Sequence, residues 1–190
     1  MTVPQMDPQT SDGALMVRAG LRDAAAFRVL VERHQDRPYR VAWRMLNDQT
    51  EAEDVAQDAL LRLWTMAPNW QAGGSGVAAW LTRVATNLCL DRLRRRRFAS
   101  DEDMPERADE APLADAQMMV AERQASAAAA VAALPDRQRA AIILTYYEEI
   151  PNKQAADMLE LNIKAFESLL LRARTALRGM LGDLKEAASD

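Results

Sequence analysis

A short acidic segment divides the sequence and places the strongest limit on its fold. Residues 99–117 hold seven acidic residues against one arginine, contain prolines and have few large apolar side chains. Such a segment buries too little apolar surface to offset the entropy lost on ordering, so we expect a flexible linker. The 190 residues therefore predict two small domains, 13–98 and 118–186, preceded by a disordered tail of residues 1–12.

The composition argues against several classes of function. The only cysteine, Cys89, and the only histidine, His34, cannot form a disulfide within the chain or a Cys/His zinc site. No apolar run approaches the roughly 20 residues of a membrane-spanning helix, and no secretory signal is visible, so we expect a cytoplasmic location. Cys89 lies in an apolar helical pattern, which is typical of a small buried side chain. Nothing in the sequence indicates an enzyme, a metal or another cofactor.

The N-terminal half has apolar residues at helical spacing and no alternating strand pattern. Residues 23–46 are expected to be helical, with Pro38 bending or dividing the helix. The next helix is predicted to begin with a capping box at residues 50–53. One of its faces carries Asp54, Gln57, Asp58 and Leu61. That face is either a solvated acidic surface or a docking surface for a basic helix, with the leucine as apolar contact.

The segment "WLTRVATNLCLDRLRRRR", residues 80–97, is predicted to be a helix with two unlike sides. Its apolar side holds Leu81, Val84, Ala85 and Leu88, and its polar side holds Arg83, Asn87 and Arg94. Arginines contact phosphates and asparagine pairs with base edges, so this side suits nucleic acid. Just upstream, Trp70 and the small residues of 71–79 could receive an extruded base. The alternative is a solvated face with a basic helix end.

The C-terminal half is predicted to contain two helices broken at Pro135, followed by a helix-turn-helix. Asn152 is expected to cap the first helix of that motif, residues 160–162 to form the turn, and the second helix to start near Lys164. The N-terminal part of such a second helix enters the major groove of DNA. Helical hairpins that bind nothing have the same pattern.

The order of these motifs resembles that of the extracytoplasmic-function sigma factors of bacterial RNA polymerase. "AEDVAQDALLRLW" resembles the polymerase-clamp-binding helix of that family, and "WLTRVATNLCLDRLRRRR" resembles its −10-element helix. "ALPDRQRAAIILTYYEEIPNKQAADMLELNIKAFESLLLRARTAL" resembles its −35-reading domain. The resemblance covers nearly the whole chain outside the first dozen residues and the linker. It implies an all-α fold of two small helical domains, the second containing the helix-turn-helix.

The resemblance also implies three groups of functional residues. The residues implied to bind core polymerase are Asp54, Gln57, Asp58 and Leu61. The residues implied to bind the opened −10 element are Trp70, Gly73, Gly74, Ser75, Arg83, Asn87, Arg94, Arg95, Arg96 and Arg97. The residues implied to bind the −35 element are Lys164, Glu167, Ser168, Leu171, Arg172 and Arg174.

The chain departs from the family pattern at named positions. Glu167 stands where a base-reading cation is usual, and glutamate can accept a hydrogen bond from a cytosine amino group. Glu160 stands in the turn where a glycine is frequent, and the loop "WQAGGSGVAAW" lacks the usual phenylalanine, aspartate and second aromatic residue.

The function implied by the resemblance is promoter-specific transcription initiation with core RNA polymerase and promoter DNA as partners, controlled by an anti-sigma factor. Two alternatives remain open. One is an autonomous helix-turn-helix regulator that binds duplex DNA without polymerase. The other is a helical adaptor that binds only proteins.

Overall fold

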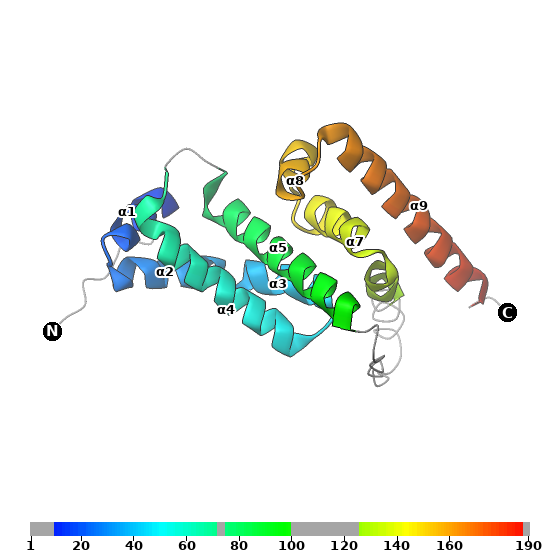
Figure 1. The fold of residues 1–190 in the computed structure, drawn as a ribbon, viewed down its shortest axis with the longest axis horizontal. Coiled ribbons are helices and arrows are strands. Elements are labelled where there is room, and N and C mark those ends of the chain that lie inside the picture. Colours follow the sequence, from blue (N-terminus) through cyan, green and yellow to red (C-terminus); the bar gives the residue numbers. More distant parts are fainter. Residues whose placement is uncertain (1–9, 72–74, 100–125, 188–190) are drawn as a thin grey trace. The chain divides into compact units, whose positions relative to one another are not determined.

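The structure is a computed structural model that describes residues 10–71, 75–99 and 126–187. Every regular element in these residues is helical and none is a strand, which confirms the all-α class (Figure 1). The chain forms two compact units, as expected from the sequence. Within the described residues, the first unit runs to Leu88 apart from Arg44–Leu46, and the second takes in that short segment and the residues from Cys89 onward. The expected linker lies outside the described residues, except for its first residue.

The first unit begins with three short helices, and two longer helices follow them. Its elements are α1 (Asp12–Gly20), α2 (Ala24–His34), α3 (Asp36–Leu46), α4 (Gln49–Met66), the 3₁₀ turn η1 (Ala67–Asn69) and α5 (Gly76–Ala99). Of α3 the first unit holds the residues before Arg44, and of α5 it holds those up to Leu88. The predicted division near Pro38 is confirmed, because α2 ends at His34 and α3 starts at Asp36. Pro38 lies in the first turn of α3, where a missing amide N–H removes no helical hydrogen bond.

Helix α1 begins inside the stretch that the sequence predicts to be a disordered tail. Ser11 caps it by accepting a hydrogen bond from the amide of Ala14 at 3.3 Å. At its other end Gly20 lies so close to η1 that an added Cβ would be 2.8 Å from the carbonyl oxygen of Ala67. The close approach of α1 to η1 therefore depends on glycine at this position.

The core of the first unit is formed by the apolar faces of these helices. Fully buried side chains come from α1, α2, α3, α4 and α5 and include Leu15, Leu30, Val41, Val55, Leu63 and Leu81. Aromatic contacts add to this packing, since the rings of Phe27 on α2 and Trp64 on α4 lie 4.8 Å apart between centroids. None of the described helices is both long and apolar enough to cross a membrane.

The second unit consists of the helical segment 126–133, α7 (Asp136–Ile142), the π-helical turn η2 (Ile143–Tyr147), α8 (Asn152–Met158) and α9 (Ile163–Ala187). The break predicted at Pro135 is confirmed, because this residue separates the segment 126–133 from α7. Helix α9 packs against both α7 and α8 (Figure 1). Phe166 and Ala173 of α9 are fully buried in the core of this unit.

Candidate functional site

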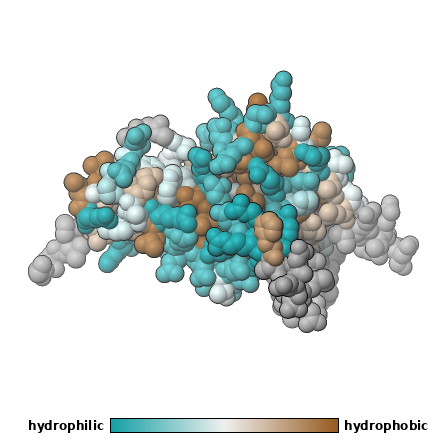
Figure 2. Space-filling view, in the orientation of Figure 1, coloured by the Kyte–Doolittle hydropathy of each residue, from teal (hydrophilic) through white to brown (hydrophobic). Residues whose placement is uncertain are grey.

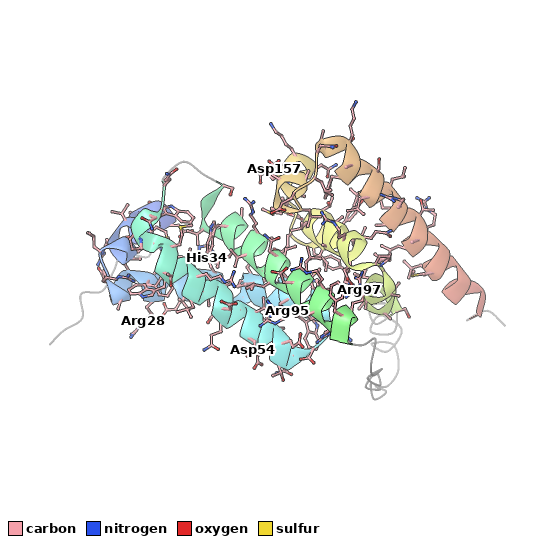
Figure 3. The ribbon with its side chains drawn as sticks, in the orientation of Figure 1. Arg28, His34, Asp54, Arg95, Arg97 and Asp157 are labelled. Carbon is pink, nitrogen blue, oxygen red and sulfur yellow. The ribbon has the colours of Figure 1, made fainter. Side chains whose placement is uncertain are left out.

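The acidic face of α4 is positioned by a cap that the sequence analysis assigned wrongly. Asp48, not the predicted box at residues 50–53, caps the helix by accepting a hydrogen bond from the amide of Glu51 at 2.9 Å. Ala52, Val55, Ala59 and Leu63 are buried on the opposite side. Asp54, Gln57 and Leu61 are exposed and Asp58 is half-buried. Figure 3 shows Asp54 on α4.

Leu61 is the apolar member of this face, with 61% of its surface exposed. A large aliphatic side chain among carboxylates suits a partner that is basic at its rim and apolar at its centre. Arg62, which the sequence analysis did not single out, forms an ion pair with Asp58 at 3.0 Å. The acid-to-base spacing of four residues on a helix was the signal that could have found this pair.

Helix α5 has the two sides that its sequence predicts. Leu81, Ala85 and Leu88 are buried, and Val84 is half-buried. Arg83 is exposed and Asn87 is half-buried on the other side. A cation and an amide on the same helical surface offer donors for phosphate oxygens together with a donor and acceptor for a base edge.

The loop before α5 is flanked by two tryptophans. The rings of Trp70 and Trp80 meet edge to face, with centroids 6.4 Å apart. Both rings are half-buried, so each keeps accessible surface. Gly73 and Gly74, two of the predicted −10 residues, lie outside the described residues, whereas Ser75 is exposed next to the start of α5. The contact of Trp80 with Trp70 was not predicted from the sequence, because no local spacing links the two residues.

The C-terminal part of α5 carries the arginine cluster Arg94–Arg97. All four residues are exposed, and Figure 3 places Arg95 and Arg97 on this part of the helix. Arg94 also forms an ion pair with Asp91 at 3.0 Å. Cations at a helix C-terminus are stabilised by the helix dipole, which favours a basic end on this helix. Its density of guanidinium groups suits a polyanion.

The helix-turn-helix consists of α8, a three-residue turn and α9. Helix α8 begins at Asn152 itself, with Pro151 before it and no side-chain cap, so the predicted capping role of Asn152 is wrong. Glu160 has a left-handed backbone, with φ of 55°. Asn162 caps α9 by accepting a hydrogen bond from the amide of Ala165 at 2.9 Å. The helix therefore begins one residue before the predicted start at Lys164.

The outward face of α9 is the one predicted from the sequence. Its predicted contact residues are all exposed, namely Lys164, Glu167, Ser168, Leu171, Arg172 and Arg174. Most of them line a shallow groove to which α8 contributes Asn152. Asn152 is thus a member of this surface that the sequence analysis considered only as a cap. Arg172 also donates from Nε to the carbonyl oxygen of Ser168 at 3.3 Å.

Apolar side chains interrupt these polar surfaces at a few places. Figure 2 shows hydrophobic patches among hydrophilic residues on the face that it draws. Leu171, at the centre of the α9 face, is 57% exposed. An exposed leucine beside Glu167 and Ser168 provides an apolar contact, and the methyl group of thymine is the matching feature in the major groove.

The single histidine, His34, and the single cysteine, Cys89, have structural roles. His34 contacts the Oδ2 atom of Asp12 through Nε2 at 2.6 Å, which ties the end of α2 to the start of α1. Cys89 is buried. Within the described part of the chain, His, Cys, Asp and Glu side chains nowhere gather in a group of three suited to a metal ion.

Comparison with known families assigns each half of the chain to the same group of proteins. Residues 30–99 match the Sigma-70 region 2 family, and residues 124–177 match the Sigma-70, region 4 family. The first match contains α4 and α5, and the second contains α7, α8 and most of α9.

Curated relatives and solved structures agree with these matches. The ECF RNA polymerase sigma factor SigE of Mycolicibacterium smegmatis is 35% identical over 80% of this chain, which spans 60% of the length of SigE. The ECF RNA polymerase sigma factor SigM of Mycobacterium tuberculosis is 31% identical, with 93% of this chain and 87% of SigM covered. The sigma factor RpoE in complex with the anti-sigma factor NepR, from Bartonella quintana, has a TM-score of 0.65 and 25% identity, covering 82% of this chain and 96% of that chain. The chain therefore belongs to the ECF RNA polymerase sigma factors.

Proposed function

We propose that this protein is an alternative sigma factor that binds core RNA polymerase and directs initiation at promoters with a particular pair of elements. The observation that carries the proposal is the presence of a region 2 domain and a region 4 domain in one chain, each with an exposed polar face. The proposed domains are residues 13–98 and 118–186, with 99–117 as the tether between them. The protein would work where core polymerase and DNA are found, in the cytoplasm.

The face of α4 would bind core polymerase. Asp54, Gln57 and Asp58 offer acceptors, and Leu61 offers an apolar centre, which together suit a basic helical partner. These are the positions at which the family resemblance places contacts with the clamp of the largest polymerase subunit.

Helix α5 and the loop before it would bind the −10 element after it opens. Arg83 and Asn87 would contact the strand, Trp70 would stack with a base, and the loop of Gly73, Gly74 and Ser75 would lie near the extruded base. Arg94, Arg95, Arg96 and Arg97 would contact phosphates near the fork. Opening would be driven by binding energy, because Trp70 and this loop would interact with the extruded base and not with the stacked one.

The outward face of α9 would read the −35 element in the major groove. Glu167 would accept a hydrogen bond from a cytosine amino group, and Leu171 would contact a thymine methyl group. Lys164, Ser168, Arg172 and Arg174 would add contacts to base edges and phosphates. Because both domains are tethered, binding of either one raises the effective concentration of the other at its element.

Regulation by an anti-sigma factor completes the proposal. RpoE of Bartonella quintana was solved with the anti-sigma factor NepR, and this chain resembles RpoE over most of its length. A partner of this kind would cover the surfaces used for polymerase and DNA. We propose no catalytic activity for the chain itself.

In vitro transcription with purified core polymerase on a promoter library tests the main proposal. We expect the protein to direct transcripts from promoters that share two conserved elements. Failure to form a complex with core polymerase would overturn the proposal. Specific duplex binding in a mobility shift without polymerase would favour the autonomous regulator. Unchanged promoter-dependent transcription in the double variant Arg83→Ala, Asn87→Ala would favour the protein-binding adaptor.

A further inference from the structure

The turn between α8 and α9 contains a residue that does not favour its backbone conformation. Glu160 has φ of 55°, in the left-handed region that glycine adopts most readily. The amide of Leu161 donates to the carbonyl of Ala156 at 2.9 Å, and the amide of Glu160 donates to that of Asp157 at 3.3 Å. These two bonds are the Schellman pattern at a helix C-terminus. The turn is therefore well formed but strained at Glu160.

A residue from another helix holds this turn. Arg137 of α7 donates from Nη2 to the carbonyl oxygen of Leu159 at 2.5 Å. Leu159 follows the last residue of α8, so its carbonyl has no partner within that helix. Leu159 is also buried, at 3% exposure, and a buried carbonyl needs a hydrogen-bond donor. Arg137 thus satisfies the backbone group directly before the strained residue.

The conformation of the turn determines which residues α9 presents. Asn162 caps α9 two residues after Glu160, so the backbone angles at 160–162 set the direction and rotation of the helix. Successive residues on a helix are about 100° apart, so even a modest rotation moves Glu167 and Leu171 away from their present directions. The packing of α9 against α7 and α8 fixes its axis, and the turn fixes its start.

We propose that Arg137 is a positioning residue for −35 recognition, acting through the carbonyl of Leu159 and without contacting a base. The proposal rests on the proposed function of α9. Arg137 would keep the turn in the strained conformation that points the reading face of α9 at the major groove. A direct phosphate contact by the exposed guanidinium is the competing role, and it predicts a uniform loss of affinity on all DNA sequences.

The first test compares substitutions that separate the hydrogen bond from the charge. Arg137→Met removes the donor, and Arg137→Lys keeps a charged donor. Arg178→Met is the matched control, because Arg178 is an exposed arginine of α9 that does not line the groove beside Glu167. Each variant is bound to core polymerase and to a duplex library randomised over the upstream element, and the preference for the selected sequences is measured.

In Arg137→Met we expect the preference for the selected upstream sequences to fall about five- to tenfold, since one well-placed base contact contributes discrimination of this size. Arg137→Lys should recover most of it, and Arg178→Met should keep it. Full preference in Arg137→Met would overturn the proposal. A uniform loss on every library member would also overturn it, in favour of the phosphate contact.

A second substitution tests the link to backbone strain. Glu160→Gly relieves the strain, so it should restore preference in the Arg137→Met background. Glu160→Gln removes the same negative charge but keeps a side chain that disfavours φ of 55°, so it should not restore preference. Equal rescue by the two substitutions would show that charge, and not the turn, is responsible.

Amide hydrogen exchange in the free protein separates this inference from the proposed function. Loss of protection at Leu161 and Ala165 in Arg137→Met, with protection restored by Glu160→Gly, is the expected result. A wild-type protein with no upstream preference would contradict the proposed function, while the exchange data would still decide whether Arg137 holds the turn. If Arg137→Met does not fold, Arg137→Leu is used, which also removes the donor. Unchanged protection in a folded variant would overturn the inference.

Discussion

Arg62 lies one helical turn after Asp58 on α4 and donates to both oxygens of its carboxylate, from Nε at 3.0 Å and from Nη2 at 3.3 Å. An exposed ion pair with this spacing contributes only about 0.3–0.5 kcal/mol, so a cation of a binding partner can replace Arg62 at little cost. We expect Arg62→Ala to bind core polymerase about twofold more tightly, because the competing cation is gone. Titration of labelled protein with purified core measures the change.

The double variant Asp54→Ala, Asp58→Ala should act in the opposite direction and bind core polymerase more weakly. Both side chains point away from the core of the first unit, so the helical content should be unchanged. Gln49→Ala is a control on the same helix, since it removes the exposed contact of Gln49 with Glu53. Full affinity of the double variant in a pull-down would show that this face of α4 does not bind core polymerase.

Glu167→Lys should change the preferred −35 sequence and leave opening of the −10 element intact. Reversing the charge replaces an acceptor for a cytosine amino group by a donor suited to guanine. Promoter selection from a library measures the preference, and a permanganate footprint on a prebound promoter measures opening. Asp157→Lys is the control, because Asp157 is an exposed acid of α8 that does not line the groove. Loss of the footprint in Glu167→Lys would contradict the separate roles of the two domains.

Gly20→Ala should destabilise the first unit by about 1–3 kcal/mol, because the new methyl group would overlap the backbone of η1. Its Cβ would be 2.8 Å from the carbonyl oxygen of Ala67. Gly13→Ala is the matched control in the same helix, where nothing lies within 4 Å of the added Cβ. Urea unfolding followed by tryptophan fluorescence checks the prediction, since Trp43, Trp64, Trp70 and Trp80 all belong to the first unit. Equal stability of the two variants would mean that α1 moves away from η1 without cost.

Asp23 should give the first unit a stability contribution that disappears in acid. Hydrogen bonding from the amide of Ala26, followed by the Arg18 side chain, lowers the pKa of Asp23 below its ordinary value of 3.8. A lowered pKa in the folded state means that stabilisation is complete above 3.8 and is lost as the pH falls through the folded value. The difference in urea midpoint between wild type and Asp23→Ala should therefore be largest near neutral pH and should shrink as the pH falls below 3.8. A difference that stays constant into acid would exclude the ionised carboxylate as its source.

Helical periodicity made much of the fold and of the candidate faces predictable. The buried Leu81 and Ala85, the exposed Arg83, and the outward Glu167 and Leu171 all follow from spacing along a single helix. Helix starts were less predictable, because several polar residues near a helix N-terminus can compete to cap it. Asp48 caps α4 although residues 50–53 also fit a capping pattern, and Asn152 does not cap α8.

Contacts between helices could not be derived from the sequence. Arg137 meets the carbonyl of Leu159 across 22 residues, and Gly20 meets Ala67 only because α1 folds back onto η1. Such contacts depend on the direction in which each helix leaves its turn, which is set by a few backbone angles, such as φ of 55° at Glu160. The apolar side of each helix could therefore be read from the sequence, since it depends on local geometry alone. The side chains that hold those helices in place became visible only in the folded chain, because they depend on packing between segments far apart in the sequence.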